Sequence, residues 1–182
     1  KIIVDPAINV LLTEIDLIPN KSIPIGYNST AKVQFNTSGA SNTALGYFAL
    51  NKNTTGYGSI AIGDLSLYKN TTGNYNIALG ACSLYGNTTG YGNIAFGYGS
   101  LVTNTTGYYN TAIGRNALNK NTAGYNNVAI GNSALYANTT GFNNVAIGCK
   151  SLWTNSAGTN NIAFGYGSLV TNSIGNNNIA FG

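Results

Sequence analysis

Four kinds of side chain in this chain could do chemistry: two cysteines, four carboxylates, asparagines in glycosylation sequons, and rows of tyrosines. There is no histidine, and from residue 42 onward the only acid is Asp64. General acid–base pairs, catalytic triads and zinc sites therefore lack their components, and calcium-binding β-roll repeats would need an aspartate in every turn. The sequence predicts a protein that is not an enzyme and that binds no metal or cofactor.

The two cysteines are far apart in any regular stack of repeats. Cys82 and Cys149 are separated by nearly four repeats of 17 residues, which places their Cα atoms roughly 19 Å apart at about 4.8 Å per coil. A disulfide requires a Cα separation of about 4.4 to 6.8 Å. We therefore expect no disulfide within the chain.

An asparagine recurs at the start of the segment Asn-Thr-Thr-Gly, where it invites two interpretations. It could be an N-glycosylation acceptor, or it could form a turn and stack on the asparagine of the next coil. Asn121, Asn155 and Asn172 keep the asparagine but lose the sequon, which favours the stacked ladder. Within the first six coils the column consists of Asn53, Asn70, Asn87, Asn104, Asn121 and Asn138.

Aromatic residues recur in two columns and are the candidate contacts with a ligand, because aromatic rings offer a large contact area at little entropic cost. Stacking on the equivalent ring one coil away is the alternative. The first column follows the turn glycine, and consists of Tyr57, Tyr91, Tyr108, Tyr125 and Phe142. The second follows a leucine, and consists of Tyr68, Tyr85, Tyr136 and Trp153.

The elements that position these side chains follow from a repeat of 17 residues. A motif Asn-x-Ala-x-Gly closes on a glycine in every repeat, and a second glycine column runs at the same step from Gly39 to Gly175. A fixed period of this size is typical of a solenoid, whose units bury apolar surface only by stacking on one another. The closing glycines are Gly46, Gly63, Gly80, Gly97, Gly114, Gly131, Gly148, Gly165 and Gly182.

The pattern within one repeat predicts two short strands and two turns. In Asn76–Gly80 the alternation places Ile77 and Leu79 on one face, which we expect to be the buried one, and Ala78 on the other. A second strand is expected to begin at Ser83-Leu84. The fold class is therefore all-β, a parallel β-solenoid with 17-residue coils.

Two segments of different character divide the chain. Residues 1–41 form an N-terminal leader or capping segment with an irregular first coil, and residues 42–182 form the solenoid. Within the solenoid, a block of four coils (42–109) recurs as 110–177, because Asn42–Tyr57 and Asn110–Tyr125 match at an offset of 68 residues.

Charge and hydropathy exclude several partners. Only 7% of the residues are charged, and the eight basic residues that give a net charge of +4 are scattered along the chain, so we expect no nucleic-acid partner. The aliphatic stretch from Ile2 to Ile18 is broken by charged residues and proline, so it cannot span a bilayer. We expect no membrane insertion.

The motifs Asn127-Val-Ala-Ile-Gly131 and Asn144-Val-Ala-Ile-Gly148 resemble repeats in the heads of YadA-like trimeric autotransporter adhesins. The longer unit ending in Asn-Thr-Thr-Gly is also similar to repeats of phage and giant-virus fibre proteins. The resemblance covers residues 42–182 and implies a left-handed parallel β-roll, three chains side by side, and display outside a cell or on a virion. The coils are longer than those of the adhesin heads, with the Asn-Thr-Thr-Gly turn as the extra element, and the coiled-coil stalk and membrane anchor of that family are not present in this sequence.

These observations favour a structural or adhesive fibre segment, extracellular or on a cell or virion surface. Its expected partners are further copies of itself, as a homotrimer or filament, and a host-surface glycan or protein receptor. The first alternative is a self-assembling filament or coat protein without a specific ligand. The second is an ice-binding protein, suggested by the threonine column that includes Thr54, Thr71 and Thr88.

Overall fold

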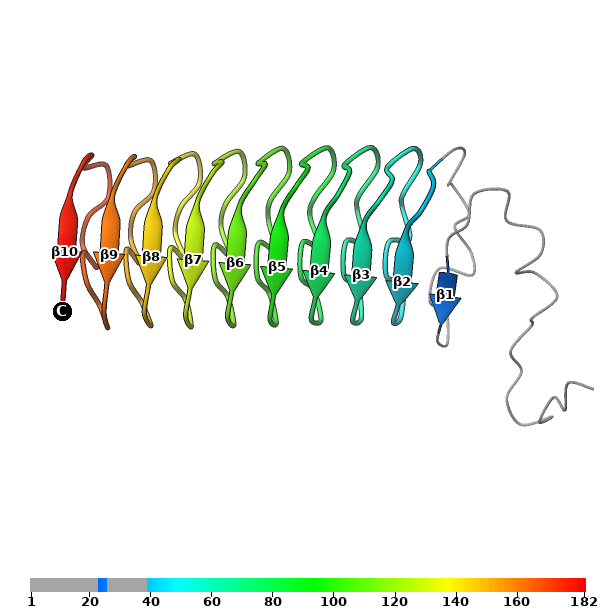
Figure 1. Ribbon diagram of the computed structural model, residues 1–182, viewed down its shortest axis with the longest axis horizontal. Coiled ribbons are helices and arrows are strands. Elements are labelled where there is room, and N and C mark those ends of the chain that lie inside the picture. The colour runs from blue at the N-terminus through cyan, green and yellow to red at the C-terminus, as the bar shows by residue number, and fades with distance from the viewer. Residues whose placement is uncertain (1–22, 26–38) are drawn as a thin grey trace, which may run out of the picture.

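The computed structural model describes residues 23–25 and 39–182. These residues form a stack of coils with one three-residue strand per coil, and no helix occurs among them (Figure 1). All ten strands lie in one parallel sheet in chain order. The strands are β1 (Ile23–Ile25), β2 (Thr43–Leu45), β3 (Ile60–Ile62), β4 (Ile77–Leu79), β5 (Ile94–Phe96), β6 (Thr111–Ile113), β7 (Val128–Ile130), β8 (Val145–Ile147), β9 (Ile162–Phe164) and β10 (Ile179–Phe181).

The strands stack with identical positions over one another. Ala61 pairs with Ala78, and Ala78 pairs with Ala95, so the register from β2 to β10 advances by one repeat per strand. The parallel β-solenoid predicted from the 17-residue period is therefore confirmed. β1 joins the same sheet through Ile23 opposite Thr43, an offset of 20 residues. The rest of the predicted leader, residues 1–22 and 26–38, lies outside the described residues.

The predicted second strand of each coil is wrong, because the chain turns where that strand was expected. Leu84 has a φ of 51°, in the left-handed region, and its amide still donates to the Ser100 carbonyl of the next coil at 3.0 Å. Neighbouring coils share this conformation, so they satisfy each other's backbone groups without an extended chain. The alternation rule assumes that only strands can do this.

A column of leucines accepts the left-handed conformation in every coil, with φ between 49° and 55°. For a residue with a side chain this costs roughly 1–2 kcal/mol. Burial of a leucine side chain stabilises the fold by about 1.5–3 kcal/mol, which offsets the cost of the left-handed conformation. Its members are Leu50, Leu67, Leu84, Leu101, Leu118, Leu135, Leu152 and Leu169.

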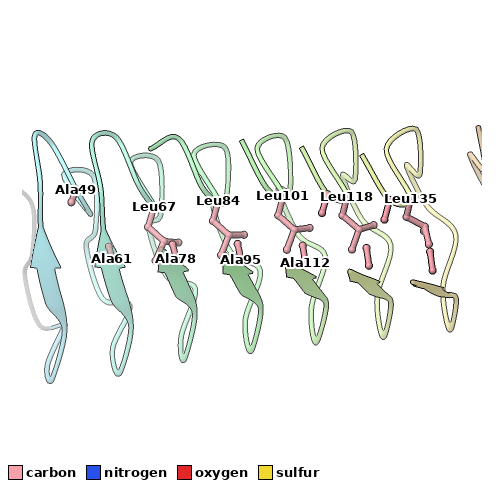
Figure 2. Packing of buried hydrophobic residues seen from close by; sticks show 14 of the residues in the cluster. Ala49, Ala61, Leu67, Ala78, Leu84, Ala95, Leu101, Ala112, Leu118 and Leu135 are labelled. Carbon is pink, nitrogen blue, oxygen red and sulfur yellow. The ribbon is translucent and has the colours of Figure 1, made fainter. Parts of the chain in front are cut away.

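The predicted inner face of the strand is also wrong, because alanine faces the core and the larger residues face outward. Ala78, Ala95 and Ala112 are completely buried, whereas Ile94 and Phe96 are 39% and 54% exposed. Figure 2 shows the reason: Leu84 and its equivalents project from the opposite wall onto the alanines and fill the thin interior. A 17-residue coil leaves no room for a second branched side chain.

We call the outward side of the strands the apolar sheet face. It consists of two columns that run along the whole stack. One column is Thr43, Ile60, Ile77, Ile94, Thr111, Val128, Val145, Ile162 and Ile179, and the other is Leu45, Ile62, Leu79, Phe96, Ile113, Ile130, Ile147, Phe164 and Phe181.

The closing glycines are required by both conformation and space. From Gly46 to Gly165 they have φ between +110° and +135°, which L-residues rarely adopt. A Cβ atom on Gly97 would lie 2.8 Å from the carbonyl of Gly114 in the next coil. The motif therefore ends in glycine because the backbones of adjacent coils meet there.

Candidate interaction surfaces

The first aromatic column is a continuous stack of rings over four coils. Tyr91 and Tyr108 have ring centroids 5.1 Å apart and planes at 1°, and the steps from Tyr108 to Tyr125 and from Tyr125 to Phe142 are both 4.8 Å. Tyr57 is not part of this stack, because Asn74 occupies the intervening coil. The ring faces inside the stack contact one another, so a ligand can reach mainly their edges.

The sequence did not identify Tyr75 and Tyr109 as candidate contacts, because each lies one position after the first aromatic column. Tyr75 packs edge-on against Tyr57 at 5.0 Å, and Tyr109 packs in the same way against Tyr91 at 5.1 Å. Each ring lies over a glycine of the preceding coil: a Cβ on Gly58 would be 2.8 Å from the Tyr75 ring. The alternation of glycine and tyrosine at successive repeats is the signal that could have identified this packing.

Two tyrosines in this group have raised pKa values. The hydrogen bond between the Tyr75 and Tyr57 side chains raises the pKa of Tyr75, and charge repulsion from Tyr57 and partial desolvation raise it further. Partial desolvation also raises the pKa of Tyr108, with smaller contributions from the charges of Tyr125 and Tyr91. Both phenols therefore stay neutral to higher pH than free tyrosine.

The second aromatic column falls into two separate pairs. Tyr68 and Tyr85 stack at 5.4 Å with planes at 9°, and Tyr136 and Trp153 lie 6.2 Å apart with planes at 31°. A lysine ammonium lies over each of these rings. The distances from Nζ to the ring centroid are 5.9 Å for Lys52 over Tyr68, 5.1 Å for Lys69 over Tyr85, 5.3 Å for Lys120 over Tyr136 and 5.9 Å for Lys150 over Trp153.

A further set of exposed aromatics follows the closing glycine of some coils. Tyr98 is 57% exposed and Tyr166 is 74% exposed, and the guanidinium of Arg115 lies 6.0 Å from the Tyr98 ring. Neither was selected from the sequence, although they recur at the 68-residue offset of the duplicated block.

The asparagines of the Asn-Thr-Thr-Gly turns form a buried hydrogen-bonded ladder. Nδ2 of Asn104 donates to Oδ1 of Asn87 at 2.8 Å and to the carbonyl of Gly107 at 2.9 Å. Its Oδ1 accepts from Nδ2 of Asn121 at 2.7 Å. From Asn53 to Asn138 the column is 1% exposed or less. Both amide hydrogens are therefore committed to the fold.

A second buried ladder comes from the asparagine that opens each repeat. The backbone N–H of Asn110 donates to Oδ1 of Asn93 at 3.0 Å, and its Nδ2 donates to the carbonyl of Gly124 at 2.8 Å. Ser59 replaces the asparagine in one coil, where its Oγ accepts from the backbone N–H of Asn76 at 3.1 Å. The interior of the coil therefore contains apolar leucine and alanine side chains and also hydrogen-bonded asparagine side chains.

The ladder predicts that the sequons carry no glycan in the folded protein. If the chain is secreted from a eukaryotic cell, Asn70, Asn87, Asn104 and Asn138 should be unmodified, because a glycan would have to replace a buried hydrogen of Nδ2. Intact-mass spectrometry of the soluble, folded fraction measures this. A folded species with a glycan on Asn87 would contradict the buried ladder.

The hydroxyl groups of the threonine column donate hydrogen bonds to neighbouring coils. Oγ1 of Thr54 donates to the Thr71 carbonyl at 2.9 Å, and Oγ1 of Thr71 donates to the Thr88 carbonyl at 3.0 Å. These hydroxyl groups therefore donate their hydrogen to the carbonyl of the next coil and not to solvent. This arrangement gives the ice-binding alternative no support.

Within residues 23–25 and 39–182, no group of three or more metal-ligating side chains comes together. The same part of the chain has no helix of the length and hydropathy needed to cross a membrane. Cys82 and Cys149 are both half-buried free thiols.

Comparison of the chain with protein-family models, with curated proteins and with solved structures finds no significant match.

Proposed function

We propose that this chain is a segment of a homotrimeric adhesive fibre, displayed outside a cell or on a virion. It acts as a rigid shaft or head for attachment to a receptor or glycan. The coils wind left-handed, as the resemblance to adhesin heads implies. The observation that carries this proposal is the apolar sheet face.

The apolar sheet face is unusual for a surface in contact with water. Sixteen of the eighteen residues in its two columns are Ile, Val, Leu or Phe, and Thr43 and Thr111 are the other two. Ile60, Ile94 and Ile113 remain 37 to 39% exposed in the single chain. Monomeric soluble proteins rarely expose continuous apolar patches of this kind.

The partner that fits this face best is another copy of the same chain. The face has a fixed repeat along its whole length, with identical positions over one another from β2 to β10. A copy placed alongside has the same repeat, so side chains can interdigitate at every coil without drifting out of register. A symmetric closed assembly then hides all copies of the face.

The resulting object is stiff and long for its mass. Nine coils at about 4.8 Å each give roughly 43 Å. The aromatic columns and the lysines lie outside the two columns of the sheet face and can contact a receptor or glycan. The proposed role is therefore to hold attachment surfaces at a distance from a cell or particle.

Substitutions on the sheet face test the assembly. We expect the unsubstituted protein to have three times the chain mass of 18.9 kDa by light scattering. The pair Ile94→Glu and Ile130→Glu should reduce it to a monomer, because six charges would be buried in a trimer. The circular dichroism spectrum should persist, since both side chains lie outside the coil.

The matched control is Val102→Glu, which adds a charge to a half-buried position on the opposite wall of the coil. It should leave the mass unchanged. A monomeric unsubstituted protein would refute the assembly, and a mass that grows without limit with concentration would favour the self-assembling filament instead.

A further inference from the structure

The wall of the coil opposite the sheet carries most of the amines in the described repeats. The leucines project from this wall toward the strands (Figure 2), and the two residues after each leucine are half-buried or exposed. We use the name lysine wall for Lys150, which precedes Leu152 and whose Nζ lies over the Trp153 ring, together with seven residues that follow the leucines: Lys52, Tyr68, Lys69, Tyr85, Lys120, Tyr136 and Trp153.

Each ring of the lysine wall lies beneath a lysine ammonium group. Lys69 lies 5.1 Å from the centroid of Tyr85, and Lys120 lies 5.3 Å from the centroid of Tyr136 in the next coil. A ring face holds a cation without neutralising it. The rings therefore attract the amines to this wall while their positive charge persists, as a binding site for anions needs.

The lysine wall consists of two patches related by the duplication. Lys52 and Tyr68 in the first patch correspond to Lys120 and Tyr136 in the second, at the 68-residue offset. Four coils separate the patches by roughly 19 Å along the stack. A polymer lying along the stack can contact both patches, and the second contact then benefits from a high effective concentration.

The charge balance of the described residues is positive. They include five cations, four of which are the lysines of this wall, and Asp64 is the one carboxylate among them. Oδ1 of Asp64 accepts a hydrogen bond from the Tyr47 amide at 3.1 Å, in the turn that follows the strand. The lysine wall itself contains no acidic residue.

We infer that the lysine wall binds an acidic polysaccharide, laid along the stack so that its carboxylate or sulfate groups meet the ammonium groups of both patches. This names the ligand class for the attachment role proposed above and depends on that role for its biological setting. Phenol hydroxyls of the tyrosines supply hydrogen bonds to the sugar hydroxyls.

The ring geometry argues against single-stranded nucleic acid as the polyanion. Proteins that bind it present open aromatic faces on which bases stack. Here Tyr68 and Tyr85 stack on each other at 5.4 Å, and the lysines lie over the rings. The bases would find no free platform, so recognition depends on charge and hydroxyl groups.

Binding assays with polygalacturonate and heparin, beside neutral dextran, test the inference. We expect both acidic polymers to bind, with an affinity that falls steeply as salt is added, and dextran not to bind. Lys69→Gln or Lys120→Gln should each weaken binding about threefold and together about tenfold. The pair Lys69→Arg and Lys120→Arg should keep binding within about twofold.

The matched control is Arg115→Gln, which removes the same charge from a cation outside the wall. It should not change the affinity. Equal loss in Arg115→Gln and Lys69→Gln, equal binding of dextran, or tighter binding of single-stranded DNA than of heparin would each overturn the inference. If the protein is trimeric but binds no polyanion, the proposed ligand class is wrong and the trimeric fibre stands. If the protein is monomeric and binds the polyanions, the trimeric fibre is wrong and the proposed ligand class stands.

Discussion

Replacement of Gly114 by alanine is expected to lower the free energy of unfolding by about 3 kcal/mol or more. Gly114 has a φ of +131°, and a Cβ there would lie 2.5 Å from the carbonyl oxygen of Gly131. That carbonyl is backbone and cannot rotate away. The two coils would have to move apart at this point. That movement would strain the neighbouring hydrogen bond, in which the Gly131 amide donates to the Ile113 carbonyl at 2.8 Å. Urea unfolding followed by circular dichroism measures the loss.

Gly167→Ala is the matched control, because it changes the same residue type where there is space. Gly167 has a φ of +64°, and a Cβ there would meet no atom within 4 Å. Lys150 already adopts the left-handed conformation at the equivalent position one coil earlier. The expected cost is about 1 kcal/mol. Equal destabilisation by the two substitutions would show that backbone conformation, not contact between coils, determines the glycine column.

Asn104→Asp is expected to cost a similar amount at neutral pH, about 3 kcal/mol or more. The substitution replaces an amide whose two hydrogens are donated to Asn87 and Gly107 with a carboxylate that donates none. Three oxygen acceptors would then face one another in a fully buried site. The rest of the ladder cannot rearrange, because every neighbour repeats the same contacts.

The penalty should depend on pH. Burial and facing acceptors raise the pKa of the new carboxyl in the folded state above its unfolded value of about 3.9. Below about pH 3.9 both states are protonated and the penalty is smallest, and it grows as pH rises toward the folded pKa. Asn126→Asp is the control, since Asn126 is exposed. A loss for Asn104→Asp that is the same at pH 3 and pH 7 would contradict the buried ladder.

The sequence correctly predicted that the coils stack in register, but it wrongly predicted which side chains of each coil face the interior. The glycine at every seventeenth position predicted coils in register, and Ala61 opposite Ala78 bears this out. The alternation in Ile77-Ala78-Leu79 correctly separated two faces. It assigned the wrong one to the core, because hydrophobicity alone favoured isoleucine and leucine over alanine.

The candidate surfaces were predicted in part. The columns of Tyr108 and Tyr85 and the stacking of their rings on the next coil could be read from the repeat. The edge-on contacts of Tyr75 and Tyr109 could not, because these rings lie over glycines of the preceding coil. The pairing of Lys69 with Tyr85 joins residues 16 positions apart. Such a pair is visible only when one coil is placed on the next.

By itself, the amino-acid sequence determined the period, the all-β class and the positions where only glycine fits, because identical units must repeat identical backbone contacts. The tertiary structure alone decided which side of each strand is inside. That choice depends on the space within one coil, where leucines in the left-handed conformation fill the interior against alanine. The larger side chains of the strands are left on the outside, where the proposed partner chains would cover them.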